Sequence, residues 1–211
     1  MKKFFRQLSL LLISLLFTSC IDYVQSITYK NGEYQIYYKV TLSKVLFALA
    51  NEDPEEIFES FDEKTLEDLP ENIDVKTVNT DLEVGAEFSH SIAPKTTDET
   101  EKSFLPTTAG QKYYIPFLLG SKNFAIADSI KSEGSDFQAF AEAIMSYAKC
   151  RVMISKKIIS SINNAYFEGS GGQNYSVPVF DYGEIYCLEI PFIILFETEM
   201  YKFDKLIVIK D

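Results

Sequence analysis

The chain has 211 residues, of which 46% are hydrophobic and 24% charged, so it is long enough to bury a sizeable core. Its 31 acidic residues outnumber its 20 basic ones, which gives a formal net charge of −11. A field of that sign repels nucleic-acid phosphates and anionic lipid head groups, and the sequence shows no basic patch that would overcome it. We therefore expect no nucleic-acid partner.

The first twenty residues have the anatomy of a secretory signal. Basic residues at positions 2, 3 and 6 precede an apolar run over 8–17, and small residues follow before Cys20. The apolar run is roughly ten residues long, whereas ~20 are needed to span hydrocarbon. Removal of residues 1–19 takes the formal net charge from −11 to −14, because three basic residues and no acid lie there.

The end of this segment, Phe17-Thr18-Ser19-Cys20, resembles a bacterial lipobox of the relaxed kind found in spirochaetes. Phe17 departs from the leucine-like residue of the usual lipobox. The resemblance implies that a signal peptide of residues 1–19 is removed and that Cys20 becomes a lipidated N-terminus, which attaches the protein to a membrane. Ile21 in place of aspartate resembles the pattern of export to the outer membrane, which we favour over the inner membrane. Plain secretion and an uncleaved membrane anchor are the alternatives.

The chain after Cys20 opens with a predicted β-hairpin. Segments 21–30 and 33–40 are rich in aromatic and β-branched residues, and they flank Asn31-Gly32, a dipeptide that suits a type I′ turn. A two-residue loop pairs Lys30 with Glu33 and sets the register of every pair beyond them. One face of the hairpin then collects apolar side chains, for which core packing is favoured over a ligand platform.

Helical spacing follows in three segments. Residues 43–50 and 53–61 predict two short helices, and Asp53 and Pro54 suit the N-cap and first helical position of the second. A longer helix that lies across the sheet is expected over 135–147. Acidic residues near Asp53 are interpreted as charges that complement the helix dipole rather than as metal ligands.

Alternating patterns predict the remaining strands. Residues 73–77 and 82–88 form a second hairpin with its turn at 79–81. Residues 94–103 are interpreted as an exposed loop or a frayed helix. Residues 113–119 are interpreted as an edge strand or a buried loop, because Pro116 cannot donate to a sheet ladder. The tail is predicted to be β-rich over 151–162, 175–180, 184–197 and 206–209, with a glycine-rich loop at 169–172.

Together these patterns predict an α+β fold: a mainly antiparallel sheet that opens with a β-hairpin and is packed by a few helices. We expect one envelope domain over residues 20–211. The order of elements from Cys20 to Ile92, with a Tyr-rich hairpin first, is similar to that of LppM-like envelope lipoprotein domains. That resemblance implies an α+β envelope domain.

Few residues carry chemistry that could define a site. After Cys20 the cysteines that remain are Cys150 and Cys187, and both a disulfide between them and two buried free thiols stay open. His90 is the single histidine of the chain, and it lies near the end of a predicted strand with no nucleophile motif around it. We predict no catalytic residue, no metal site and no cofactor.

The expected function is therefore that of a membrane-anchored envelope lipoprotein that binds another envelope protein or has a structural role. Two alternatives from other classes are kept. One is a carrier of a lipid or other apolar ligand, suggested by 13 Tyr and 17 Phe residues. The other is a hydrolase that uses a pair of carboxylates.

Overall fold

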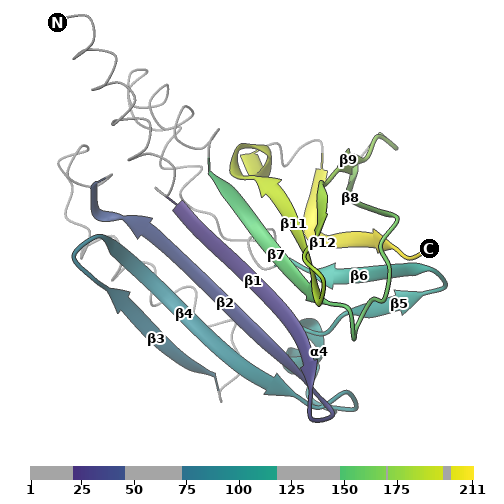
Figure 1. Cartoon of the computed structure of the whole chain (residues 1–211), viewed down its shortest axis with the longest axis horizontal. Helices are drawn as coiled ribbons and strands as arrows, with labels where there is room; N and C mark the ends of the chain where they lie inside the picture. Colours follow the sequence, from purple (N-terminus) through teal and green to yellow (C-terminus); the bar gives the residue numbers. More distant parts are fainter. Residues whose placement is uncertain (1–20, 46–72, 118–147, 170, 197–200) are drawn as a thin grey trace, which may run out of the picture.

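The computed structural model describes residues 21–45, 73–117, 148–169, 171–196 and 201–211. Figure 1 shows that these residues form two β-sheets. The larger, sheet A, has seven strands in the order β10-β11-β7-β1-β2-β4-β3. The smaller, sheet B, has five strands in the order β5-β6-β12-β8-β9.

The strands of sheet A are β1 (Ile21–Lys30), β2 (Glu33–Ser43), β3 (Asp74–Asn79), β4 (Glu83–Ile92), β7 (Lys149–Ser155), β10 (Val179–Asp181) and β11 (Ile185–Pro191). Those of sheet B are β5 (Thr107–Ala109), β6 (Lys112–Pro116), β8 (Asn164–Gly169), β9 (Tyr175–Ser176) and β12 (Tyr201–Ile209). The described residues also form a short α-helix, α4 (Glu99–Ser103), and a 3-10 helix, η3 (Phe192–Phe196).

The first hairpin has the predicted register. Lys30 lies opposite Glu33, and the antiparallel ladder continues from there to the start of β1. Asn31 and Gly32 both have positive φ angles, 56° and 88°, as a type I′ turn requires. The dipeptide thus sets the pairing of β1 and β2, which are 10 and 11 residues long.

The second hairpin is also confirmed, with β3 antiparallel to β4. Residues 94–98 are mostly exposed, and α4 follows with the Asp98 carboxylate as its N-cap. Residues 113–116 lie in β6, which is an interior strand between β5 and β12 rather than an edge strand or a buried loop. Pro116 is tolerated because it is the last residue of β6, and the amide of Phe117 donates to the Asp204 carbonyl, 3.1 Å away.

The predicted α+β fold is wrong, because the core face of sheet A packs against sheet B instead of against helices. The predicted β-rich tail divides between the sheets: β7, β10 and β11 extend sheet A, whereas β8, β9 and β12 join β5 and β6 in sheet B. Two apolar sheet faces can cover each other as well as a helix can cover one. Of the predicted helix over 43–50, Ser43 is instead the last residue of β2, and residues 46–50 lie outside the described residues. The predicted helices over 53–61 and 135–147 also lie outside them.

Aromatic side chains connect the two sheets through the core. The ring of Tyr23 in β1 lies 5.7 Å from that of Phe117, which lies 5.4 Å from Phe167 in β8. Phe167 in turn lies 5.1 Å from Phe203 in β12. All four are buried and belong to one continuous hydrophobic cluster. The described interior between the sheets is therefore filled by the chain's own side chains.

Candidate functional site

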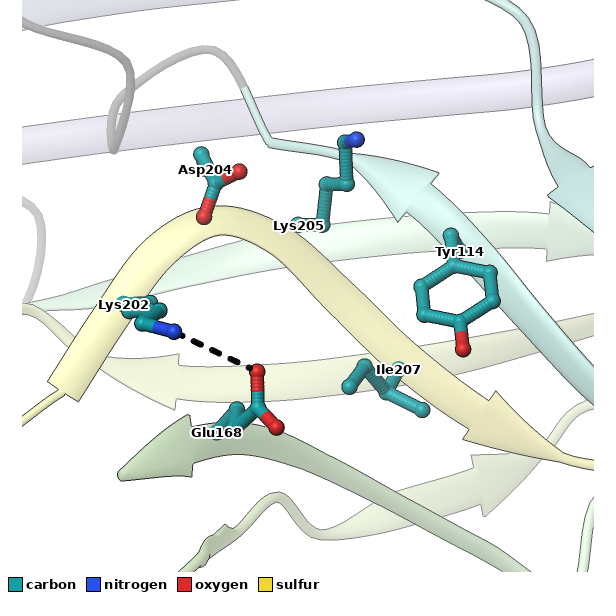
Figure 2. Close-up of a pocket in the computed structure, with 6 residues that line it drawn as sticks. All are labelled: Tyr114, Glu168, Lys202, Asp204, Lys205 and Ile207. Atoms are coloured by element: carbon teal, nitrogen blue, oxygen red, sulfur yellow. Dashed lines mark ion pairs between the residues drawn. The ribbon is translucent and has the colours of Figure 1, made fainter. Parts of the chain in front are cut away.

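A hollow on sheet B lies where β12 changes its pairing with β8 (Figure 2). The register is regular at Lys202, which pairs with Glu168, and again at Ile207, but it shifts between them. Such an irregularity bends a strand and re-aims its side chains. The hollow has a volume of about 260 Å³ and is lined by Tyr114, Glu168, Lys202, Asp204, Lys205 and Ile207.

The lining of this hollow is polar and balanced in charge. Figure 2 shows Lys202 directed at Glu168, and their charged atoms are 3.7 Å apart. Their side chains are 65% and 58% exposed, so the pair contributes little, ~1 kcal/mol or less. Neither a histidine nor a cysteine lines the hollow. The four charged side chains that line the hollow are exposed, so each remains solvated.

A network of ion pairs crosses the outer face of sheet A, the face turned away from sheet B. Arg151 and Lys39 approach Asp22 to 3.2 and 3.7 Å, and Lys39 also lies 3.3 Å from Glu83. These pairs join β7, β1, β2 and β4 side by side, so they support strand register. Each contributes at most about 1 kcal/mol, because the side chains are partly solvated.

Tyr37 extends this outer face. Its hydroxyl donates to the Glu87 carboxylate at 2.9 Å. Burial, with a smaller effect of that bond, raises the pKa of Tyr37 to about 12. The phenol therefore stays protonated at neutral pH and acts as a donor between β2 and β4.

His90, the histidine weighed for catalysis, lies in β4 and contacts α4. Its Nε2 is 3.1 Å from a Glu101 carboxylate oxygen, and the hydroxyl of Thr96 donates to the other oxygen. The Thr96 bond and then the His90 bond lower the pKa of Glu101. The hydroxyl bonds the carboxylate and not the imidazole, so this trio lacks the order of a nucleophile, base and orienting acid. It ties α4 to the edge of the core.

The two described cysteines are free buried thiols. They lie on adjacent strands, but Cys150 pairs with Ile190 and Cys187 pairs with Met153. The offset is three residues, which places the two side chains on opposite faces and separates their Cα atoms by roughly 10 Å along the strands. A disulfide needs about 7 Å or less, so this register holds them apart. Burial raises the pKa of both thiols.

Cys20, the predicted lipidation residue, lies outside the described residues, and β1 begins at the next residue, Ile21. The described ranges contain no helix that is long and apolar enough to cross a membrane. Nor do they contain a group of three or more histidine, cysteine or acidic residues that could hold a metal ion.

Sequence reasoning did not find the exposed apolar side chains. Four large ones lie on the described surface: Val45 at 42% exposure, Leu82 at 70%, Phe180 at 42% and Tyr182 at 65%. They form two pairs at opposite ends of sheet A. Val45 follows the end of β2 and Leu82 lies in the β3–β4 turn, at the end of the sheet where β1 begins. Phe180 lies in β10 and Tyr182 in the turn after it. The available signal in the sequence was a large apolar residue next to typical turn residues, such as Leu82 after Asp81 and Tyr182 before Gly183.

Comparison of the chain with family models, curated proteins and solved structures found no match. A functional interpretation must therefore come from the chemistry of the chain itself.

Proposed function

We propose that this chain is a lipid-anchored envelope protein whose paired β-sheets present a protein-binding surface away from the membrane. The observation that carries the proposal is the direct succession of Cys20 and β1, which begins at Ile21. A lipid attached to Cys20 would hold the end of a seven-stranded sheet at the bilayer with no linker between them. Several acyl chains would attach the protein firmly to the membrane, whereas a single chain attaches a protein only reversibly.

A corner of sheet A far from the start of β1 supports the protein-binding part of the proposal. We call Phe180 and Tyr182, with Cys187 and Met153 beside Phe180 in the outer face, the distal corner. Phe180 pairs with Cys187, which pairs with Met153, so an apolar row leads inward from the exposed ring. Aromatic residues and methionine are enriched in protein interfaces.

The turn of the distal corner is held in place before any partner arrives. Gly183 has a φ of 83°, and its amide donates to the Asp181 carboxylate at 2.9 Å. Lys156 lies 2.7 Å from the same carboxylate and 4.7 Å from the centre of the Tyr186 ring. A partner would lose less entropy on binding an ordered turn than on binding a loose one.

The two alternative functions draw less support from the described residues. An apolar carrier needs an open interior, whereas Tyr23, Phe117 and Phe167 fill the space between the sheets with one another. A carboxylate hydrolase needs two acids in one cleft. Asp22 and Glu83 on the outer face instead each form an ion pair with Lys39, within 4 Å, and are partly solvated, so they do not supply such a cleft.

The anchor is tested by replacing Cys20 with Ser in the producing bacterium. We expect the wild type to incorporate labelled palmitate and to partition with membranes, and Cys20→Ser to lose the label and be released or remain unprocessed. Cys187→Ser is the matched control and should keep both the label and the membrane fraction. An unlabelled wild type, or a Cys20→Ser protein with unchanged label, would overturn the anchor.

The distal corner is tested by placing a photo-reactive amino acid at Tyr182 in living cells. We expect an adduct of defined mass that disappears when Phe180 is also replaced by Ser. The same probe at Lys112, which is exposed on sheet B, should give no such adduct. Absence of an adduct at position 182, or the same adduct from position 112, would refute this surface.

A further inference from the structure

The end of sheet A that follows Cys20 is formed by several strands at one level. Ile21 in β1 pairs with Leu42 in β2, Leu42 pairs with Val84 in β4, and Val84 pairs with Asn79 in β3. This row crosses the sheet, and Figure 1 shows the β3–β4 turn at the same end as the start of β1. Neighbouring strands are ~4.8 Å apart, so β4 lies roughly 10 Å from β1. We call this region the proximal end.

The proximal end holds the most exposed of the large apolar side chains described, Leu82, at 70%, with Val45 at 42%. The backbone around Leu82 is tied down. Its carbonyl accepts from the Lys44 amide at 2.8 Å, and its amide donates to the Thr80 hydroxyl at 3.3 Å. The Thr80 amide closes the turn on the Glu83 carbonyl at 2.8 Å. Leu82 is therefore an aliphatic side chain held outward by an ordered turn.

The charges of the proximal end are mixed. The Lys44 ammonium donates to the Asn79 side-chain oxygen at 2.7 Å, and Asp81 beside Leu82 is exposed. The Lys44 ammonium and the Asp81 carboxylate suit the phosphate and the ammonium of a zwitterionic phospholipid head group, whereas Glu83, on the other side of Leu82, is paired with Lys39. The strongly negative net charge of the chain opposes binding to anionic lipid.

We propose that Leu82 and Val45 enter the interfacial layer of a zwitterionic bilayer and form a second contact beside the lipid on Cys20. The inference rests on the proposed lipid anchor. Two aliphatic side chains would not hold a free protein on a membrane, but an anchor at the same end of the sheet gives them a high local concentration of lipid. The contact would set the orientation of the sheet on the membrane and keep the distal corner turned away from it.

The chain contains no tryptophan, so a single introduced one reports its own surroundings. Leu82→Trp is compared with Tyr182→Trp, which places the probe on an exposed aromatic site at the other end of sheet A. The acylated full chain is reconstituted into phosphatidylcholine vesicles whose acyl chains carry bromine, a contact quencher, or do not. We expect Leu82→Trp to shift to shorter wavelength and lose most of its fluorescence in brominated vesicles, and Tyr182→Trp to be unaffected.

The outcomes separate the two proposals. Acylated protein that co-floats with vesicles but leaves Leu82→Trp unquenched overturns the second contact and leaves the anchor standing. Equal quenching at both positions also overturns it, because the protein would then lie on the membrane without a preferred end. A wild type with no acyl chain refutes the anchor. The second contact then falls with the anchor, because Leu82 and Val45 would not hold a free protein on a membrane.

Discussion

Gln25 bridges the two sheets from the middle of the core, and its replacement tests how the sheets are held together. The side chain is fully buried on β1 of sheet A. Its amide nitrogen donates to the Pro116 carbonyl of β6 in sheet B at 2.6 Å, and its oxygen accepts from the Tyr23 hydroxyl at 3.0 Å. We expect both Gln25→Leu and Gln25→Glu to weaken the fold, with different dependence on pH.

Gln25→Leu roughly keeps the volume of the side chain but removes both the donor to the Pro116 carbonyl and the acceptor of the Tyr23 hydroxyl. The cost of leaving a half-buried carbonyl without this partner is about 1–2 kcal/mol, the lower part of the range for an orphaned buried group. For a chain of this size that loss lowers the unfolding temperature by about 2–8 °C. The difference from wild type should not vary with pH, because neither side chain titrates.

Gln25→Glu places a carboxylate beside the Pro116 carbonyl oxygen. The buried charge costs several kcal/mol at neutral pH, so the folded state raises the pKa of this Glu above its ordinary value of ~4.3. The destabilisation is therefore absent below that value, grows as the pH rises above it, and is complete at the raised folded-state pKa. At acid pH the protonated carboxyl can donate to Pro116 as the native amide does.

Urea unfolding followed by circular dichroism at several pH values measures both variants. Tyr38→Phe is the matched control, because Tyr38 lies opposite Gln25 in the register and its buried hydroxyl has no hydrogen-bond partner among the described residues. Removing that hydroxyl should leave stability unchanged or raise it. If Gln25→Leu is as stable as wild type, or if the stability of Gln25→Glu relative to wild type does not change with pH, the Gln25 bridge does not stabilise the fold as argued.

Three further predictions follow from the same structure. Gly85→Ala should cost about 1–3 kcal/mol, since a Cβ there would stand 2.7 Å from a backbone Cα of β2; equal urea midpoints for this variant and the unhindered Gly171→Ala would contradict it. The threonine and histidine partners lower the pKa of Glu101, so its contribution to stability is complete above the ordinary 4.5 and is lost as the pH falls through the lower folded value. Glu101→Gln should lack this acid dependence, and parallel stability curves for variant and wild type would count against it. Cys150 and Cys187 should resist a thiol reagent in the native protein and react after denaturation, whereas rapid native labelling would show that they are accessible.

The parts of the fold that were predicted depend on residues close together in the chain. Asn31-Gly32 selects the turn, and the turn sets the register of β1 on β2. The alternation over 73–88 similarly predicts β3 and β4. The sequence pattern does not predict β8, because the three consecutive buried residues Ala165 to Phe167 lack the period of two that marks a strand with one covered face.

Sequence alone predicts an export signal with a lipid anchor at Cys20, and it determined the strongly acidic charge and the two local hairpins. Tertiary structure decided which strands share a sheet, because pairing joins residues far apart in the chain. β7 lies parallel to β1, with Cys150 opposite Tyr23, and β12 lies between β6 and β8. An alternating pattern indicates that one face of a strand is apolar, but it does not indicate what packs against that face. It therefore could not distinguish a covering helix from a second sheet. The same non-local pairing placed Leu82 at the end of the sheet where β1 begins and Tyr182 at the opposite end, so these two exposed sites are recognised only in the folded chain.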